Sequence, residues 1–178
     1  FPLRTNCRNS PQIAAGIEIT SGLSPGYSRV LHTADGPDIE VGFAHSQEDR
    51  VALLRRSLST FLDLYSPDQI VVLSTRDDES STAAILSSRS SEVPLEALRS
   101  GRRSPGTVGF ATVHAFKGLE STAVVMTDIA GLAEPEERTL LYVGMSRARV
   151  FLSLQMFESC RKQWLRLVNE GLRVAAPP

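Results

Sequence analysis

The sequence predicts an α/β fold with a largely parallel sheet, and three observations support this prediction. Segments typical of strands and of helices mostly alternate along the chain. The strand segments are mostly apolar, as in Gln69–Ser74, which is typical of strands buried on both faces of a parallel sheet. Hydrophobic residues make up 42 % of the 178 residues and charged residues 22 %. The chain therefore has enough apolar surface for the core of one domain, or of one lobe of a larger enzyme.

Up to Ser74, the chain is expected to hold two helices and three strands. The first helix begins after an N-cap at Asn9 or Ser10, and Pro11 lies in its first turn. An amphipathic helix follows over Ser46–Tyr65, with Ser46 as its cap. The strands are expected over Ser28–Thr33, Ile39–Ala44 and Gln69–Ser74, with a turn at Asp35–Asp38 joining the first two.

Beyond Ser74, the chain is expected to hold three helices and three strands. Residues 88–106 mix Ser, Arg, Pro and Gly, which predicts mostly loop, and residues 171–178 are expected to fray. The helices are expected over Ser80–Ser87, Glu136–Arg149 and Ser159–Asn169, the last ending before Gly171. The strands are expected over Val108–Val113, Ala123–Asp128 and Val150–Gln155.

Several classes of protein are excluded by composition. The longest apolar runs, Ala123–Met126 and Val150–Leu154, are far too short to span a bilayer, so no membrane association is expected. Two cysteines make neither a disulfide framework nor a zinc site, which favours a reducing, cytoplasmic setting. The chain starts at Phe1 without an initiator methionine or a signal-peptide core. We therefore expect residues 1–178 to be a single lobe cut from a longer chain.

The net charge of −1 conceals an asymmetry between the halves of the chain. Residues 1–88 carry 7 basic and 11 acidic side chains, whereas residues 89–178 carry 12 and 9. Of the 19 basic residues, 17 are arginines. Genomic base composition explains such an excess, and so does phosphate recognition by the guanidinium fork. Composition alone does not separate the two explanations.

The densest polar cluster follows the strand expected at Val108–Val113. A Lys-Gly pair after a strand allows backbone amides to approach a phosphate. The phosphate-binding pattern G-x-x-x-x-G-K-[ST] occurs nowhere in the chain. Ligands in parallel-sheet folds lie at the carboxyl ends of strands, so the loops after Val72, Val113 and Val125 are candidate binding loops. The cluster comprises Thr112, His114, Lys117, Gly118 and Glu120.

Two arginines are candidate anion-binding residues. In a helix over Glu136–Arg149, Arg147 lies on the flank of the apolar face and Arg149 points to solvent. A flank arginine must reach a partner or a cleft, because burying it unpaired is costly. A structural ion pair with Glu136 or Asp128 is the alternative. Arg8 precedes a helix N-cap, where it either meets an anion or a carboxylate, or is simply solvated.

Taken together, these segments resemble the second RecA-like lobe (domain 2A) of superfamily 1 helicases of the UvrD/Rep-like group. The strand Val71–Arg76 resembles the strand that follows motif IV, and the resemblance covers nearly the whole chain. Chance rarely produces two such specific patterns together: T-x-H-x-x-K-G-L-E and, about twenty residues later, L-Y-V-x-x-[ST]-R-A. The resemblance implies a RecA-like three-layer fold without its own P-loop. Motifs IV, V and VI are resembled by Leu3–Asn9, Thr112–Glu120 and Leu141–Ala148.

The resemblance also implies a function. ATP with Mg²⁺ would bind between this lobe and a first RecA-like lobe that carries the P-loop and the magnesium ligands. Arg8 and Arg147 would reach the γ-phosphate as arginine fingers. The nucleotide site would further include Lys117, Gly118 and Glu120, with Glu120 accepting from the ribose. Single-stranded or partly duplex DNA would contact Thr112, His114 and Arg76.

The implied protein is an ATP-dependent DNA helicase or translocase, of which this lobe alone is inactive. A non-catalytic helicase-like interaction module and a lobe of an RNA-directed superfamily 1 motor are the alternatives. The chain departs from the family pattern at Cys7, Ser121 and Ser146. The short interval between Arg76 and Thr112 implies that the 2B insertion of Rep-like enzymes is absent.

Overall fold

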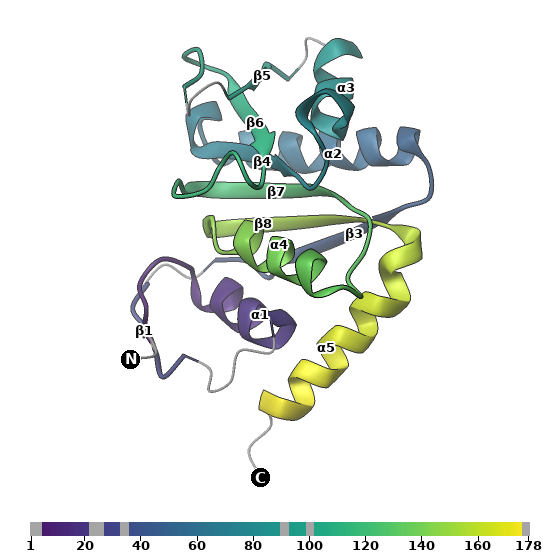
Figure 1. Ribbon diagram of the computed structural model, residues 1–178. Coiled ribbons are helices and arrows are strands. Elements are labelled where there is room, and N and C mark those ends of the chain that lie inside the picture. Colours follow the sequence, from purple (N-terminus) through teal and green to yellow (C-terminus); the bar gives the residue numbers. More distant parts are fainter. Residues whose placement is uncertain (1–4, 22–26, 33–35, 90–92, 99–101, 176–178) are drawn as a thin grey trace.

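The computed structural model describes residues 5–21, 27–32, 36–89, 93–98 and 102–175 (Figure 1). Its centre is a six-stranded sheet in the order β3-β8-β7-β4-β6-β5, and every neighbouring pair is parallel. The predicted α/β class with a largely parallel sheet is therefore confirmed. A separate parallel pair joins β1 (Thr5–Asn6) to β2 (Arg29–Val30). The six strands are β3 (Glu40–Ala44), β4 (Ile70–Ser74), β5 (Leu95–Ala97), β6 (Val108–Thr112), β7 (Ser121–Ile129) and β8 (Ala148–Phe157).

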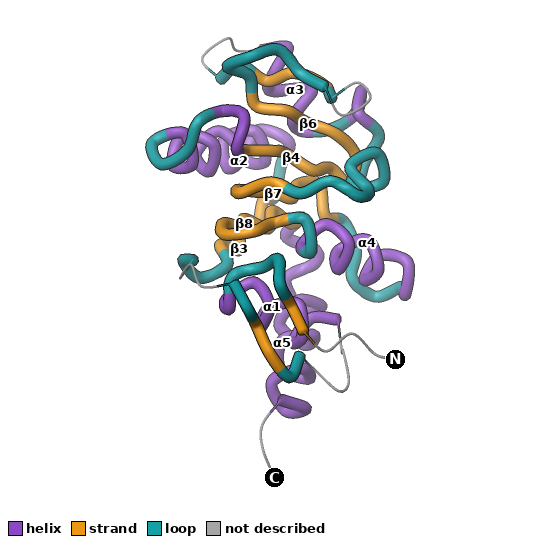
Figure 2. Tube along the Cα trace, turned by 90° about the vertical axis from the view of Figure 1, so that its left-hand side faces the viewer, coloured by secondary structure: helices purple, strands orange, loops and turns teal. Residues whose placement is uncertain are grey.

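Helices cover both faces of this sheet and make three layers. Alternate residues of each buried strand serve opposite faces: Ile70 and Val72 pack with α2 and α3, whereas Val71 and Leu73 pack with α1 and α4. Figure 2 shows the strands from β6 to β3 stacked between these helices, with α5 lying beside α1. The helices are α1 (Pro11–Ser21), α2 (Gln47–Leu62), α3 (Thr82–Arg89), α4 (Pro135–Met145) and α5 (Arg161–Ala175).

The predicted helix at Ser46–Tyr65 forms as α2, with the expected cap. The Ser46 hydroxyl accepts from the Asp49 amide at 3.0 Å, and the Asp49 carboxylate accepts from the Ser46 amide at 3.0 Å. These two bonds satisfy backbone donors that the first turn would otherwise leave unpaired. None of the helices in the described ranges is long and apolar enough to cross a membrane.

The prediction of one helix over Glu136–Arg149 is wrong at its end. The amides of Ser146 and Arg147 close the last turn by donating to the carbonyls of Tyr142 and Gly144. The chain then enters β8, where Ala148 pairs with Ser121 of β7. Arg147 thus lies in the connection, and Arg149 lies in a strand rather than on the solvent side of a helix. The helical pattern concealed this change because both elements contribute apolar residues to the same core.

Residues 88–106, predicted as mostly loop, also hold a short strand, because β5 pairs with β6 at the side of the sheet. Residues 90–92 and 99–101 lie outside the described residues.

Two further expectations need correction. The closing helix continues past Gly171 to Ala175, and 176–178 lie outside the described residues. Gly171 does not end the helix but allows contact with α1, since a Cβ there would lie 2.0 Å from the Ile19 carbonyl oxygen. The two strands expected on either side of the turn at Asp35–Asp38 form as β2 and β3, but they belong to different sheets. Leu3, Thr33 and Asp35, on which other predictions fell, lie outside the described ranges.

Candidate functional site

The polar cluster of the sequence lies on a crossover between two parallel strands. Residues 113–120 connect the carboxyl end of β6 to the amino end of β7, and β4 lies between these strands in the sheet. The buried Phe116 anchors this crossover in the core. Gly118 adopts φ 87°, a left-handed conformation that favours glycine. The crossover therefore places Thr112 and Glu120 at opposite edges of the sheet.

Three of the predicted site residues lie at the carboxyl edge. Ser74 and Thr112 are paired neighbours at the ends of β4 and β6, and Arg76 and His114 follow them as exposed residues. The Arg76 amide donates to the Ser74 hydroxyl at 2.9 Å. The Thr112 hydroxyl accepts from the Ala115 amide at 3.0 Å and fixes the turn after the strand. Arg76, Thr112 and His114 are thus held at one edge by backbone contacts.

The arginines gather instead at the amino edge, around Glu120. Arg8 Nε lies 2.8 Å from Glu120 Oε2, and Arg149 Nε lies 3.7 Å from Glu120 Oε1. All three side chains are between 43 % and 49 % exposed, so they remain accessible to a ligand. Binding residues were expected at the carboxyl ends of the strands. Arg76, Thr112 and His114 lie there. Arg8, Glu120 and Arg149 lie at the amino ends instead.

Arg147 lies beside this ion-paired group. Its Nε donates to the Val143 carbonyl at 3.1 Å, and its Nη1 donates to the Leu119 carbonyl at 3.4 Å. Partial burial, and after it the charge of Arg8, lowers the pKa of the Arg147 guanidinium from its usual value. The guanidinium still carries its charge at neutral pH. These contacts differ from the ion pairs with Glu136 or Asp128 that were the structural alternative.

Two buried asparagines hold the Arg8 segment against the core. The Asn6 side-chain oxygen accepts from the amides of Arg8 and Asn9 at 3.0 Å each. The Asn9 side chain donates to the Ala148 carbonyl at 2.5 Å, and the Ser10 amide donates to the Arg149 carbonyl at 2.7 Å. These bonds place Arg8 next to the start of β8 although about 140 residues separate them in sequence.

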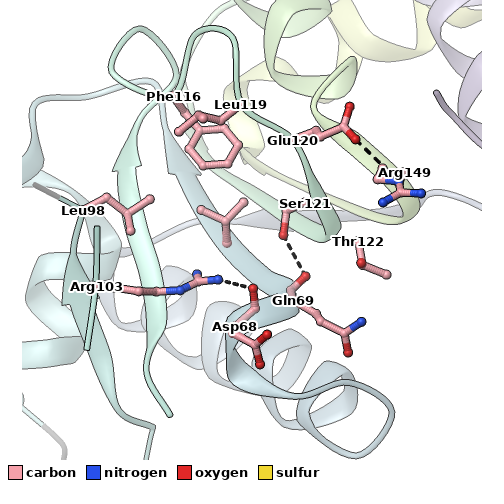
Figure 3. Close-up of a pocket in the computed structure, with 11 residues that line it drawn as sticks. Asp68, Gln69, Leu98, Arg103, Phe116, Leu119, Glu120, Ser121, Thr122 and Arg149 are labelled. Carbon is pink, nitrogen blue, oxygen red and sulfur yellow. Dashed lines mark hydrogen bonds and ion pairs between the residues drawn. The ribbon is translucent and has the colours of Figure 1, made fainter. Parts of the chain in front are cut away.

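A hollow of about 270 Å³ opens beside Glu120 (Figure 3). Phe116 and Leu119 contribute apolar side chains to its wall, and Arg103 and Arg149 contribute cations. The Arg103 guanidinium is itself engaged, because it donates to the Ile70 carbonyl at 2.9 Å and to the Asp68 carbonyl. Sequence reasoning missed Arg149 as a site residue, because it assigned this position to a helix rather than to the start of a strand.

Asp128 is a second residue that sequence reasoning missed. It is fully buried at φ 64°, next to a register shift between β7 and β8. Its carboxylate accepts from the Ser74 hydroxyl at 2.9 Å, from the Thr82 amide at 3.0 Å and from the Thr82 hydroxyl at 2.5 Å. Arg50 Nε lies 3.9 Å away. Asp128 thereby ties the ends of β4 and β7 to the start of α3, and it lines the same hollow as Arg76.

Comparison with known proteins identifies helicase relatives. Residues 108–154 match the family model of the UvrD-like helicase C-terminal domain. The ATP-dependent DNA helicase HMI1, mitochondrial, of Saccharomyces cerevisiae is 37 % identical over 67 residues. That match covers 38 % of this chain and 9 % of the yeast protein. The crystal structure of the C-terminal domain of a possible DNA helicase from Lactobacillus plantarum WCFS1 is similar with a TM-score of 0.64 at 20 % identity. That similarity covers 85 % of this chain and 87 % of the other, and it supports the fold alone.

Proposed function

We propose that this UvrD-like helicase C-terminal lobe is the second motor lobe of an ATP-dependent DNA helicase or translocase. The observation that carries the proposal is the convergence of Arg8, Glu120 and Arg147 at the amino ends of β7 and β8. These residues come from the segments that resemble motifs IV, V and VI. On this proposal the lobe supplies half of an ATP site, and a first lobe of the same protein supplies the other half.

The charges at this edge suit a nucleoside triphosphate. The guanidinium groups of Arg8 and Arg149 pair with the Glu120 carboxylate, and that of Arg147 lies beside them, so the edge carries excess positive charge. Arg8 and Arg147 act as arginine fingers that stabilise the charge on the transferring phosphoryl group. Magnesium held by the first lobe would further neutralise the phosphate oxygens. The Glu120 carboxylate accepts from a ribose hydroxyl, and Lys117 and Gly118 shape the turn beside it.

The opposite edge suits a nucleic acid backbone. Arg76 and His114 are exposed at the carboxyl ends of adjacent strands, next to Thr112. Arginine and threonine donate to phosphate oxygens in protein–DNA complexes. We assign single-stranded DNA to this edge. The crossover 113–120, which Phe116 anchors in the core, then connects the strand ends assigned to DNA with the strand ends assigned to ATP.

Separate substitutions at the two edges test this assignment in the full-length protein. Arg147→Ala is expected to lower steady-state ATPase by about 10³-fold or more, because it removes an arginine finger. It should leave the affinity for single-stranded DNA within about threefold of wild type. Arg147 lies away from the proposed DNA contacts, and an exposed charge outside a contact changes affinity little. Arg76→Ala is expected to weaken DNA binding and its salt dependence, because it removes a phosphate contact. Equal, large losses of ATPase and DNA binding in Arg147→Ala would count against the finger role.

Two alternatives make different predictions about the whole protein. A non-catalytic interaction module would lack G-x-x-x-x-G-K-[ST] and an acidic magnesium-binding motif in the first lobe. An RNA-directed motor would have its ATPase stimulated more by RNA than by DNA oligomers of the same sequence. The 37 % identity of 67 residues to a protein described as a DNA helicase favours DNA.

A further inference from the structure

Arg149 lies at the amino edge beside Glu120, and the function proposed above gives it no role beyond its charge. We infer that Arg149 is a positioning residue of the nucleotide site, which holds the Glu120 carboxylate for the ribose after Arg8 turns to the phosphates. This inference rests on the proposed roles of Arg8 and Glu120. It explains why two arginines, rather than one, contact this carboxylate.

The two arginines contact different oxygens of the carboxylate. Arg8 Nε is 2.8 Å from Oε2, whereas Arg149 Nε is 3.7 Å from Oε1. Figure 3 shows Glu120 and Arg149 pointing toward one another across the rim of the hollow. A departure of Arg8 therefore frees Oε2 as an acceptor and leaves the contact at Oε1 in place.

The backbones of Glu120 and Arg149 are fixed to each other by the sheet. Ser121 follows Glu120 and pairs with Ala148, which precedes Arg149. The Ser121 amide donates to the Arg147 carbonyl at 3.0 Å. Arg149 is further fixed by its own carbonyl, which accepts from the Ser10 amide at 2.7 Å. Arg8, in contrast, lies in the segment between β1 and α1, outside the large sheet.

Arg147 does not perform this positioning task. Its guanidinium contacts the carbonyls of Val143 and Leu119, at 3.1 Å and 3.4 Å, rather than the Glu120 carboxylate. Within the described ranges, the cations that form ion pairs with Glu120 are Arg8 and Arg149. Once Arg8 engages a phosphate, Arg149 is therefore the cation that keeps the carboxylate oriented.

The expected effect is modest, because the pair is half exposed. An exposed ion pair changes an equilibrium by up to about fivefold. In the full-length helicase, Arg149→Ala should raise the KM for ATP by about two- to fivefold and leave kcat within about twofold. Arg149→Lys should restore part of the affinity, since it keeps the charge. Arg173→Ala, which removes an exposed arginine on α5, is the matched control and should change neither constant.

Nucleotide analogues distinguish positioning from general loss of structure. DNA-stimulated ATPase is measured with ATP, 2′-deoxy-ATP and 3′-deoxy-ATP, the last two each lacking one ribose hydroxyl. Wild type should have a lower KM for ATP than for at least one analogue, and Arg149→Ala should reduce that difference. An equal rise in KM for ATP and both analogues, or no rise at all, would overturn the inference.

Glu120→Ala, which removes the acceptor oxygens, separates this inference from the function on which it rests. It should reduce the difference in KM between ATP and the analogues further than Arg149→Ala does, and adding Arg149→Ala to it should have little further effect. If Glu120→Ala leaves that difference intact, the ribose role fails and the inference fails with it. If Glu120→Ala reduces the difference but Arg149→Ala does not, the inference alone fails.

Discussion

At the residue scale, the candidate site depends on arginines that meet one carboxylate from distant parts of the chain. Arg8, Glu120 and Arg147 were identifiable from the sequence because each lies in a motif with a recognisable spacing. Arg149 was not, because its position relative to Glu120 depends on the pairing of Ser121 with Ala148. Pairing between parallel strands is a long-range property that local periodicity does not report.

Gly118 provides a prediction about a single backbone conformation. It lies at φ 87° with open space around the position of a Cβ, so a side chain there meets strain but no clash. Gly118→Ala should therefore lower the free energy of unfolding of the lobe by about 1–2 kcal/mol. Gly118→Asn should cost less, because Asn tolerates this conformation better. Urea denaturation measures both, and equal stability of Gly118→Ala and wild type would contradict the assigned conformation.

At the element scale, most helices and strands followed from the sequence, and the errors have physical causes. The junction at Ser146 was missed because α4 and β8 share one apolar core, so hydrophobicity continues across it. The edge strand β5 was missed because its side chains are only half-buried and its three residues are too few for a pattern. A glycine after a helical pattern predicts the end of a helix, whereas Gly171 marks the contact of α5 with α1. A sequence pattern therefore indicates that a residue is buried, but it does not indicate which element buries it.

Asp128 is expected to stabilise the elements that present Arg76. Asp128→Ala removes the acceptor for the Thr82 amide and for the hydroxyls of Ser74 and Thr82. It also leaves the neighbouring Arg50 without its counter-charge. The free energy of unfolding should fall by about 3–5 kcal/mol, as when one partner of a buried charged group is lost.

Asp128→Asn is the matched variant, because it keeps an acceptor oxygen and tolerates the positive φ. It should cost about 1–2 kcal/mol, mainly through weaker hydrogen bonds. Chemical denaturation of the three proteins side by side measures these differences. A loss of less than about 1 kcal/mol in Asp128→Ala would show that the carboxylate does not hold these elements together.

At the scale of the whole molecule, the parallel sheet separates the candidate residues into two edges. Strand ends that follow one another in sequence lie on opposite edges, so Thr112 and Glu120 are apart although eight positions separate them. The sequence predicted the fold class and indicated these candidate residues, but it did not predict this division. On the proposed function, coupling between ATP and DNA would pass through the crossover 113–120 and the neighbouring strands, rather than within one compact loop.

The central claim is that this lobe completes an ATP site by supplying arginine fingers. Single-turnover hydrolysis of ATP by the full-length protein, with ATP affinity measured separately, tests it most directly. Arg147→Ala should slow the hydrolysis step by about 10³-fold or more, while ATP affinity changes far less. A hydrolysis step within about tenfold of wild type would contradict the account, because an arginine finger stabilises the transition state.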